Sequence, residues 1–165
     1  MWNQLKKVAQ SSPELVMMVG IPGSGKSTYV QQLKEKGYEV INPDAIRFEL
    51  TGDMADQSQN KRVWDLTYER LVKLLKSGRN AVLDATNVNL SNRRKFMNAV
   101  KEEVPNVVFK AIVVNVDKEE AIRRVQKRVS EGGLDIPSDV MDRMYNNMQL
   151  NPPTEEEGFE TIEII

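Results

Sequence analysis

Apolar residues in this chain gather in short runs that alternate with longer segments in which apolar and polar positions recur with helical spacing. The runs are rich in Val, Ile and Met and several end at Gly, Pro or Asn, which is typical of strands buried inside a sheet. The pattern predicts strands at 14–19, 38–41, 80–83, 107–116 and 161–165.

The segments between these runs predict helices. The longest, 57–77, places Val63, Leu66, Leu71, Leu74 and Leu75 on one face. Ser91 is expected to open one helix, Ser138 to cap another, and a turn of helix is expected to start near Asp44. The predicted helices are 3–9, 26–36, 57–77, 91–103, 118–131 and 138–149.

Strands that alternate with helices of this length indicate right-handed βαβ units. We therefore expect an α/β fold of three layers, with a parallel sheet and helices on both faces. No repeat or linker divides the 165 residues, so we expect a single domain over 1–165. Ligands of such sheets bind at the carboxyl ends of the strands.

A phosphate-binding motif follows the first strand. Residues 20–28, G-I-P-G-S-G-K-S-T, satisfy G-x-x-x-x-G-K-[ST] between a predicted strand and a predicted helix. Backbone N–H groups of such a loop and the helix N-terminus hold phosphates, the lysine reaches the β- and γ-phosphates, and the serine hydroxyl binds Mg²⁺. A chance glycine-rich turn is the alternative, but such a match is rare. We expect a P-loop NTPase fold that binds ATP and Mg²⁺ through Gly23, Ser24, Gly25, Lys26, Ser27 and Thr28.

Two further strand ends carry acidic residues. Asp44 and Arg47 are three residues apart, so on a helical turn they share a face and fit an acceptor site with one proton acceptor and one cation. An N-cap Asp beside a surface Arg explains the same spacing. Asp84, at the end of the third strand, occupies the position of a carboxylate associated with Mg²⁺. A turn-forming D-A-T-N loop explains it equally well.

A basic helix carries Arg123, Arg124, Lys127 and Arg128 just before Gly132-Gly133. Arg124 and Arg128 share a face, and Ile122, Val125 and Val129 are expected on the buried side. This pattern fits a helical lid that closes over phosphates, whereas an ordinary solvated face is the alternative. Arg93, Arg94, Lys95 and Arg143 fit either a track for a nucleic-acid backbone or solvated helix faces.

Composition narrows the chemistry. The chain has no His and no Cys, which excludes a Ser-His-Asp triad, a thiol nucleophile and zinc–thiolate sites. Net charge is −1, but residues 151–165 hold −5 and the first 150 residues +4. The mild excess of positive charge in the first 150 residues suits phosphate ligands, and it is far below the positive charge of a dedicated duplex-binding protein. No run is long enough for a membrane helix and no secretory signal is visible, so we expect a cytoplasmic protein without a membrane partner.

Four of these motifs together resemble the polynucleotide 5′-hydroxyl-kinase family, in particular the kinase domain of the phage T4 type. They are G-I-P-G-S-G-K-S-T, N-P-D-A-I-R, D-A-T-N-V-N-L-S-N-R-R and R-R-V-Q-K-R, and their order agrees from about residue 15 to 150. The ending N-P-P-T-E-E-E-G-F-E-T-I resembles that of eukaryotic relatives. No D-x-D-x-[TV] phosphatase or K-x-D-G ligase signature is present, so if the chain is a polynucleotide kinase we expect the kinase domain alone.

The resemblance implies a role for each matching residue. Lys26 and Ser27 hold the ATP phosphates and the metal, Asp44 is the general base, and Arg47 binds the acceptor. Asp84 supports the metal's water shell, and Arg128 is the lid arginine beside Arg124. Thr86 and Asn87 are expected near the acceptor. The expected reaction is transfer of the γ-phosphate of ATP to 5′-hydroxyl ends of DNA or RNA.

Two other functions remain open from the sequence. One is a P-loop kinase that phosphorylates a hydroxyl of a small metabolite. The other is an ATP-dependent switch or assembly factor, for which the polar loop at 52–60 offers a mobile segment but no switch signature.

Overall fold

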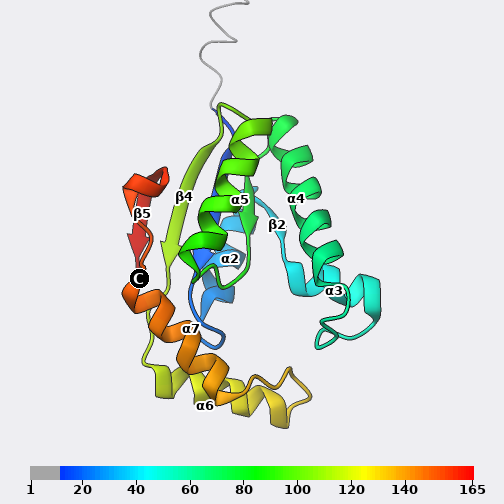
Figure 1. Cartoon of the computed structure of the whole chain (residues 1–165), viewed down its shortest axis with the longest axis vertical. Helices are drawn as coiled ribbons and strands as arrows, with labels where there is room; N and C mark the ends of the chain where they lie inside the picture. Colours follow the sequence, from blue (N-terminus) through cyan, green and yellow to red (C-terminus); the bar gives the residue numbers. More distant parts are fainter. Residues whose placement is uncertain (1–11) are drawn as a thin grey trace, which may run out of the picture.

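Five parallel strands form one sheet in the order β2-β3-β1-β4-β5 in the computed structural model, which describes residues 12–165 (Figure 1). Every neighbouring pair is parallel. The helix expected at 3–9 lies outside the described residues. The strands are β1 (Glu14–Val19), β2 (Glu39–Ile41), β3 (Ala81–Leu83), β4 (Val108–Val113) and β5 (Phe159–Ile164).

Helices cover both faces of this sheet, so the expected three-layer α/β fold is confirmed. Figure 1 shows α4 and α5 in front of the strands, α2 behind them, and α6 and α7 beyond the strands' carboxyl ends. The helices are α2 (Lys26–Glu35), α3 (Pro43–Thr51), α4 (Asn60–Lys76), α5 (Leu90–Glu103), α6 (Lys118–Ser130) and α7 (Ser138–Leu150), and a 3₁₀ turn, η1 (Glu155–Glu157), precedes β5.

Alternate residues of β1 supply the two halves of the core, as the period of two in a strand requires. Leu15 and Met17 pack with residues of α4 and α5, including Leu71 and Met97. Val16 and Met18 join a second cluster with Val30 of α2 and other residues. β1 is central and buried, which fixes the position of the loop that follows it.

A third apolar cluster anchors the helices beyond the strand ends. Val19 and Ile21 pack there with Val125 of α6 and Met141 of α7. The expectation that Val129 is buried on the same side is wrong, because Val129 is 36% exposed near the C-terminal end of α6. That end carries Arg128 and leads into Gly132, whose φ is 90°.

Several predicted element ends differ in the structure because a different residue caps the helix. Asn89, not Ser91, caps α5, and its side chain accepts a hydrogen bond from the Asn92 N–H. Ser138 is the first residue of α7 rather than its cap, since the N-cap position is Pro137. β4 ends at Val113, three residues earlier than expected, and β5 begins at Phe159, two residues earlier.

No helix within residues 12–165 is long and apolar enough to cross a lipid bilayer.

Candidate active site at the carboxyl ends of the strands

The loop between β1 and α2 has the backbone geometry of a phosphate cradle. Gly23 and Gly25 have φ of 80° and 97°, a region that glycine enters without steric cost. Gly25 is the N-cap of α2 and offers no side-chain cap, so the first N–H groups of this helix remain available to an anion. The buried Ser24 hydroxyl has no hydrogen-bond partner within residues 12–165. These donors fit a polyphosphate.

The Lys26 ammonium lies inside this loop. Its Nζ donates to the carbonyls of Gly20 at 2.8 Å and Ile21 at 2.9 Å. Burial lowers the pKa of Lys26 to about 8, although the nearby Asp84 carboxylate acts in the opposite direction. A bound polyphosphate would favour the charged form and raise this pKa again, so the lysine suits an anion.

A cavity of about 390 Å³ opens over the loop and is called the P-loop cavity here. Gly23, Ser24, Gly25, Lys26 and Ser27 form one wall. Asp44 of α3 and Asp84, which follows β3, also line it, as do Arg128 near the end of α6 and Gly133 beyond that end. The structure therefore brings together seven residues expected at the donor phosphates and the metal, together with the expected base Asp44.

Thr28 and Arg124 lie on another side of the loop. With Ser24, Gly25 and Tyr29 they line a separate cavity of about 410 Å³, the Thr28 cavity. The Arg124 guanidinium donates from Nη1 to the Gly23 carbonyl at 3.1 Å and from Nε to Glu120 at 3.0 Å. Arg124 thus supports the loop from outside, while Arg128, one turn further along α6, faces the P-loop cavity.

A third cavity, of about 480 Å³, adjoins the P-loop cavity and contains Arg47, so we call it the Arg47 cavity. The two share Asp44, Asp84 and Thr86. A ligand in one cavity and a ligand in the other would therefore meet beside these two carboxylates.

Asp44 is free to face this junction because another residue caps α3. The Asn42 Oδ1 accepts hydrogen bonds from the N–H groups of Asp44 at 2.8 Å and Ala45 at 3.3 Å. The N-cap interpretation of Asp44 is therefore wrong. The Asn42 Nδ2 donates to Asp84 Oδ2 at 3.2 Å, so this one side chain orients both carboxylates.

Arg47 is held in place from two sides. Its Nη1 lies 2.5 Å from Asp44 Oδ1, and its Nε and Nη2 donate to Asn60 Oδ1 at 3.2 and 3.1 Å. Only 6% of Arg47 is exposed, so it is not the surface arginine of the alternative interpretation. Asp44 Oδ2 has no hydrogen-bond partner among the described residues.

Ser27 and Asp84 supply oxygen atoms of the kind that Mg²⁺ prefers. Both line the P-loop cavity. Burial raises the pKa of the Asp84 carboxyl, while Lys26 and the Asn42 amide pull it down. Within residues 12–165, no three carboxylates gather into a metal cluster. The pair fits a metal that takes most of its ligands from phosphate oxygens and water.

Two neighbouring residues of the loop after β3, Thr86 and Asn87, line different cavities. Thr86 lines the junction, and its carbonyl accepts a hydrogen bond from Gly20 N at 3.0 Å. Asn87 has a positive φ of 50°, and its Nδ2 donates to the Met18 carbonyl at 2.7 Å. Asn87 lines neither the P-loop cavity nor the Arg47 cavity but a pocket between α4 and α5.

The four basic residues considered as a backbone track do not form a set. Arg93 is only 1% exposed, and its guanidinium bonds to Glu157 and to the carbonyls of Asn87 and Asn151. Arg94, Lys95 and Arg143 are exposed. Arg93 is thus a structural cation, and a solvated or backbone-tracking face is wrong for it.

Sequence reasoning missed three residues of the site. Asn42 has a local signal, because Asn before Pro is a frequent start of a helix. Asn60 has none, since its contact with Arg47 depends on how α4 packs on α3. Trp64, which lines the Arg47 cavity, carries no signal in the sequence beyond that of an ordinary helical position.

Comparison with known proteins agrees with this geometry. A model of the AAA domain family matches residues 15–151. A baculovirus protein of Autographa californica nuclear polyhedrosis virus, assigned as a bifunctional polynucleotide kinase/RNA ligase, is 31% identical over 132 residues, which are 72% of this chain and 18% of that protein. The bifunctional polynucleotide phosphatase/kinase of Schizosaccharomyces pombe is 26% identical over 153 residues, 91% of this chain and 33% of its own length.

A relative with a different kind of name also matches. The heterogeneous nuclear ribonucleoprotein U-like protein 2 of Mus musculus is 28% identical over 150 residues, 83% of this chain and 20% of its length. The chain spans about a fifth to a third of these curated relatives.

Among solved structures, a chain of the Pnkp1/Rnl/Hen1 RNA repair complex superposes with a TM-score of 0.73 at 23% identity and covers 88% of this chain and 47% of that one. This likeness concerns the fold. The family match over residues 15–151 and the phosphate cradle at its start agree: the chain belongs to the AAA domain family of P-loop proteins.

Proposed function

We propose that this protein is an ATP-dependent polynucleotide 5′-hydroxyl kinase, which transfers the γ-phosphoryl group of ATP to a 5′-hydroxyl end of DNA or RNA. The observation that carries the proposal is the position of Asp44 where the P-loop cavity and the Arg47 cavity meet. The names of the baculovirus and fission-yeast relatives support the choice of a polynucleotide as acceptor.

ATP would occupy the P-loop cavity through its phosphates. The N–H groups of the loop and of the α2 N-terminus bind them, and the Lys26 ammonium exchanges its two carbonyl partners for β- and γ-phosphate oxygens. Arg128 adds positive charge from the end of α6. The Thr28 cavity, on the other side of the loop, leaves room for the nucleoside, with Arg124 beside it.

Mg²⁺ would be held by the Ser27 hydroxyl and phosphate oxygens, with Asp84 supporting its water shell. When bound, the metal neutralises charge on the transferring phosphoryl group.

The acceptor hydroxyl would enter from the Arg47 cavity. Its oxygen forms the new bond to the γ-phosphorus as the bond from that phosphorus to the β–γ bridging oxygen breaks, and ADP leaves. The hydroxyl proton passes to Asp44 Oδ2, the oxygen not engaged by Arg47. The Arg47 guanidinium binds a phosphate of the acceptor, and Thr86 lies at the same junction.

Transfer of labelled phosphate tests the proposal. Wild-type protein with γ-labelled ATP should label 5′-hydroxyl oligonucleotides at their 5′ ends, where a phosphatase removes the label. Asp44→Asn should bind ATP as before and lose transfer by roughly 100-fold or more, since a general base contributes about 10²–10⁴. Asp65→Asn, an exposed aspartate on α4 that lines none of these cavities, is the matched control.

Three results would count against the proposal. A panel of sugars and nucleosides labelled far better than any oligonucleotide would make this a small-metabolite kinase with the same donor site. ATP hydrolysis that needs no acceptor, together with partner binding, would indicate a switch. Retained transfer by Asp44→Asn would remove Asp44 from its role and leave Asp84 as the remaining carboxylate at the junction.

A further inference from the structure

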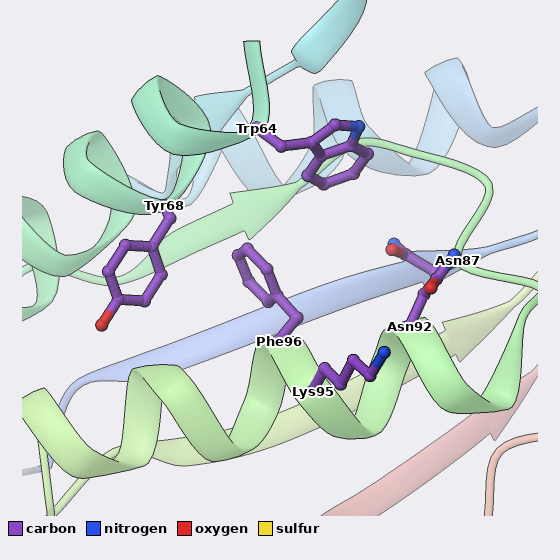
Figure 2. Close-up of a pocket in the computed structure, with 6 residues that line it drawn as sticks. All are labelled: Trp64, Tyr68, Asn87, Asn92, Lys95 and Phe96. Atoms are coloured by element: carbon purple, nitrogen blue, oxygen red, sulfur yellow. The ribbon is translucent and has the colours of Figure 1, made fainter. Parts of the chain in front are cut away.

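A pocket of about 410 Å³ lies between α4 and α5, outside the site described above (Figure 2). We call it the aromatic pocket. It takes Trp64 and Tyr68 from α4, Asn92, Lys95 and Phe96 from α5, and Asn87 from the loop after β3. No step of the proposed transfer uses this pocket.

Three aromatic rings from the two facing helices line it. Trp64 and Tyr68 each meet Phe96 edge to face, with ring centroids 6.2 Å apart in both pairs and interplanar angles of 74° and 86°. The Tyr68 hydroxyl donates to the Ala99 carbonyl at 3.0 Å, and Phe96 packs against the core. These contacts fix the rings, whereas Trp64 remains 39% exposed. A fixed and accessible aromatic wall favours stacking of a flat ligand.

The polar side chains of the pocket are accessible to a ligand. Asn92 and Lys95 are exposed, and within residues 12–165 the Lys95 ammonium and the Asn92 side-chain amide form no hydrogen bond or ion pair with another residue. The Asn87 amide uses its Nδ2 on Met18, and its Oδ1 stays free among the described residues. Figure 2 shows Asn87, from the loop after β3, and Asn92, from α5, toward the same end of the pocket, and Lys95 on the same helix as Phe96. One cation and two amides suit a ligand that carries both a base edge and a phosphate.

The aromatic pocket adjoins the Arg47 cavity at one side chain. Trp64 lines both. The loop after β3 gives Asp84, Ala85 and Thr86 to the Arg47 cavity and the next residue, Asn87, to the aromatic pocket. A chain whose end reaches Asp44 can therefore continue past the Trp64 indole into this pocket.

We propose that the aromatic pocket binds a nucleobase of the acceptor strand downstream of its 5′-terminal nucleotide. The base stacks on the Phe96 ring, its edge faces the inclined Trp64 indole, and the following phosphate lies near Lys95. The inference rests on the proposed function, because the strand enters from the junction at Asp44. Stacking on aromatic side chains tolerates any base, so the pocket selects for strand length rather than for sequence.

Acceptors of increasing length test this directly. The wild type should phosphorylate a nucleoside 3′-monophosphate with a KM about 5- to 150-fold higher than that of a 5′-hydroxyl tetranucleotide, the effect of one stacked base. Tetranucleotides with one abasic residue, placed in turn at the second, third and fourth positions, should lose this advantage at one position. This measurement needs no variant of the protein.

Two variants test whether the lower KM of the tetranucleotide comes from the aromatic pocket. Phe96→Leu keeps apolar volume but removes the flat ring, and Lys95→Ala removes the cation. Both should raise the KM of the tetranucleotide and leave unchanged the KM of ATP and the kinetics with the nucleoside 3′-monophosphate. The matched controls are Phe48→Leu, at an exposed phenylalanine on α3 that lines none of the cavities, and Lys101→Ala, at an exposed lysine on α5.

The outcomes separate the two proposals. Equal KM for all lengths, or a tetranucleotide KM unchanged in both pocket variants, overturns the stacking site while the polynucleotide kinase stands. Absence of transfer to every nucleotide acceptor rejects the kinase proposal and this inference with it.

Discussion

Arg93 and Glu157 form an ion pair that solvent does not reach: Arg93 Nε lies 2.8 Å from Glu157 Oε1, and the two side chains are 0% and 1% exposed. The same guanidinium donates to the carbonyls of Asn87 at 3.0 Å and Asn151 at 2.8 Å. Glu157 Oε2 in turn accepts from the Thr154 N–H at 2.7 Å. One side chain thus joins α5 to the loop after β3, to the end of α7 and to η1.

Breaking this pair from one side should destabilise the protein strongly. Arg93→Met or Glu157→Gln leaves a buried group without its partner, and we expect a loss of about 3–5 kcal/mol in the free energy of unfolding. Urea denaturation followed by circular dichroism measures it. Lys76→Met, which breaks an exposed pair with Glu103, is the control and should cost less than about 1 kcal/mol. Equal effects of the buried and exposed variants would contradict this role for Arg93.

The pKa of Lys26 should make ATP binding depend on pH. Burial places this pKa at about 8 in the folded protein, against 10.5 ordinarily. Bound phosphates favour the ammonium form, so binding takes up a proton above pH 8, and the affinity should fall up to about tenfold per pH unit there. Calorimetry in buffers of different ionisation enthalpy detects the proton. Lys26→Met should bind ATP weakly and without this uptake; a pH-independent wild-type affinity between pH 7 and 9.5 would refute the linkage.

The same lowered pKa affects the stability of the protein without ATP. Between about pH 8 and 10.5 the folded protein holds fewer protons at Lys26 than the unfolded chain does. The contribution of this group to the free energy of unfolding therefore rises with pH across that window. Lys26→Met should remove the rise, which urea titrations at pH 7.5 and 10 would measure.

Arg47 should act on the acceptor rather than on ATP. Removing a charged hydrogen-bond donor from the Arg47 cavity costs about 1.5–3 kcal/mol, so Arg47→Ala should raise the KM of a 5′-hydroxyl oligonucleotide by about 10- to 150-fold. Asn60→Ala should reproduce part of this effect, because Asn60 holds the guanidinium through two hydrogen bonds. Steady-state kinetics in which ATP and the oligonucleotide are varied in turn would show which of the two substrates Arg47 binds. A larger change in the KM of ATP would reassign Arg47 to the donor side, and thermal melts exclude loss of folding as the cause.

Gly23 should tolerate no side chain. A Cβ there would lie 2.5 Å from the Ala121 carbonyl oxygen, and φ is +80°. Gly37 has φ of +98°, but a Cβ added there would meet nothing within 4 Å, so Gly37→Ala isolates the backbone cost of about 1–2 kcal/mol. Gly23→Ala should cost that and a further 1–3 kcal/mol or so from the clash, and it should weaken ATP binding. Equal unfolding free energies of the two variants would show that α6 moves away from the added Cβ at little energetic cost.

The parts of the site that sequence could predict are those encoded locally. Lys26 and Ser27 follow from a contiguous motif, and Asp44 and Asp84 follow from the rule that parallel strands end at one edge of the sheet. Contacts between distant segments have no such signal. Asn60 reaches Arg47 across two packed helices, and Arg93 is buried by a segment that lies 64 residues further along the chain. In the sequence Arg93 therefore looks like a solvated residue on a helix surface, although its ion-pair partner Glu157 lies in the acidic C-terminal segment.

The close approach of Gly23 to Ala121 also limits how α6 can move. The loop contacts α6 near the N-terminal end of this helix, while Arg128 lies seven residues further along, roughly 10 Å away on the helical rise. A shift of α6 toward the loop is blocked by these backbone atoms. The contact between Gly23 and Ala121 therefore sets a lower limit on how near Arg128 can come to the loop, because any closer approach of α6 would press two backbones into each other.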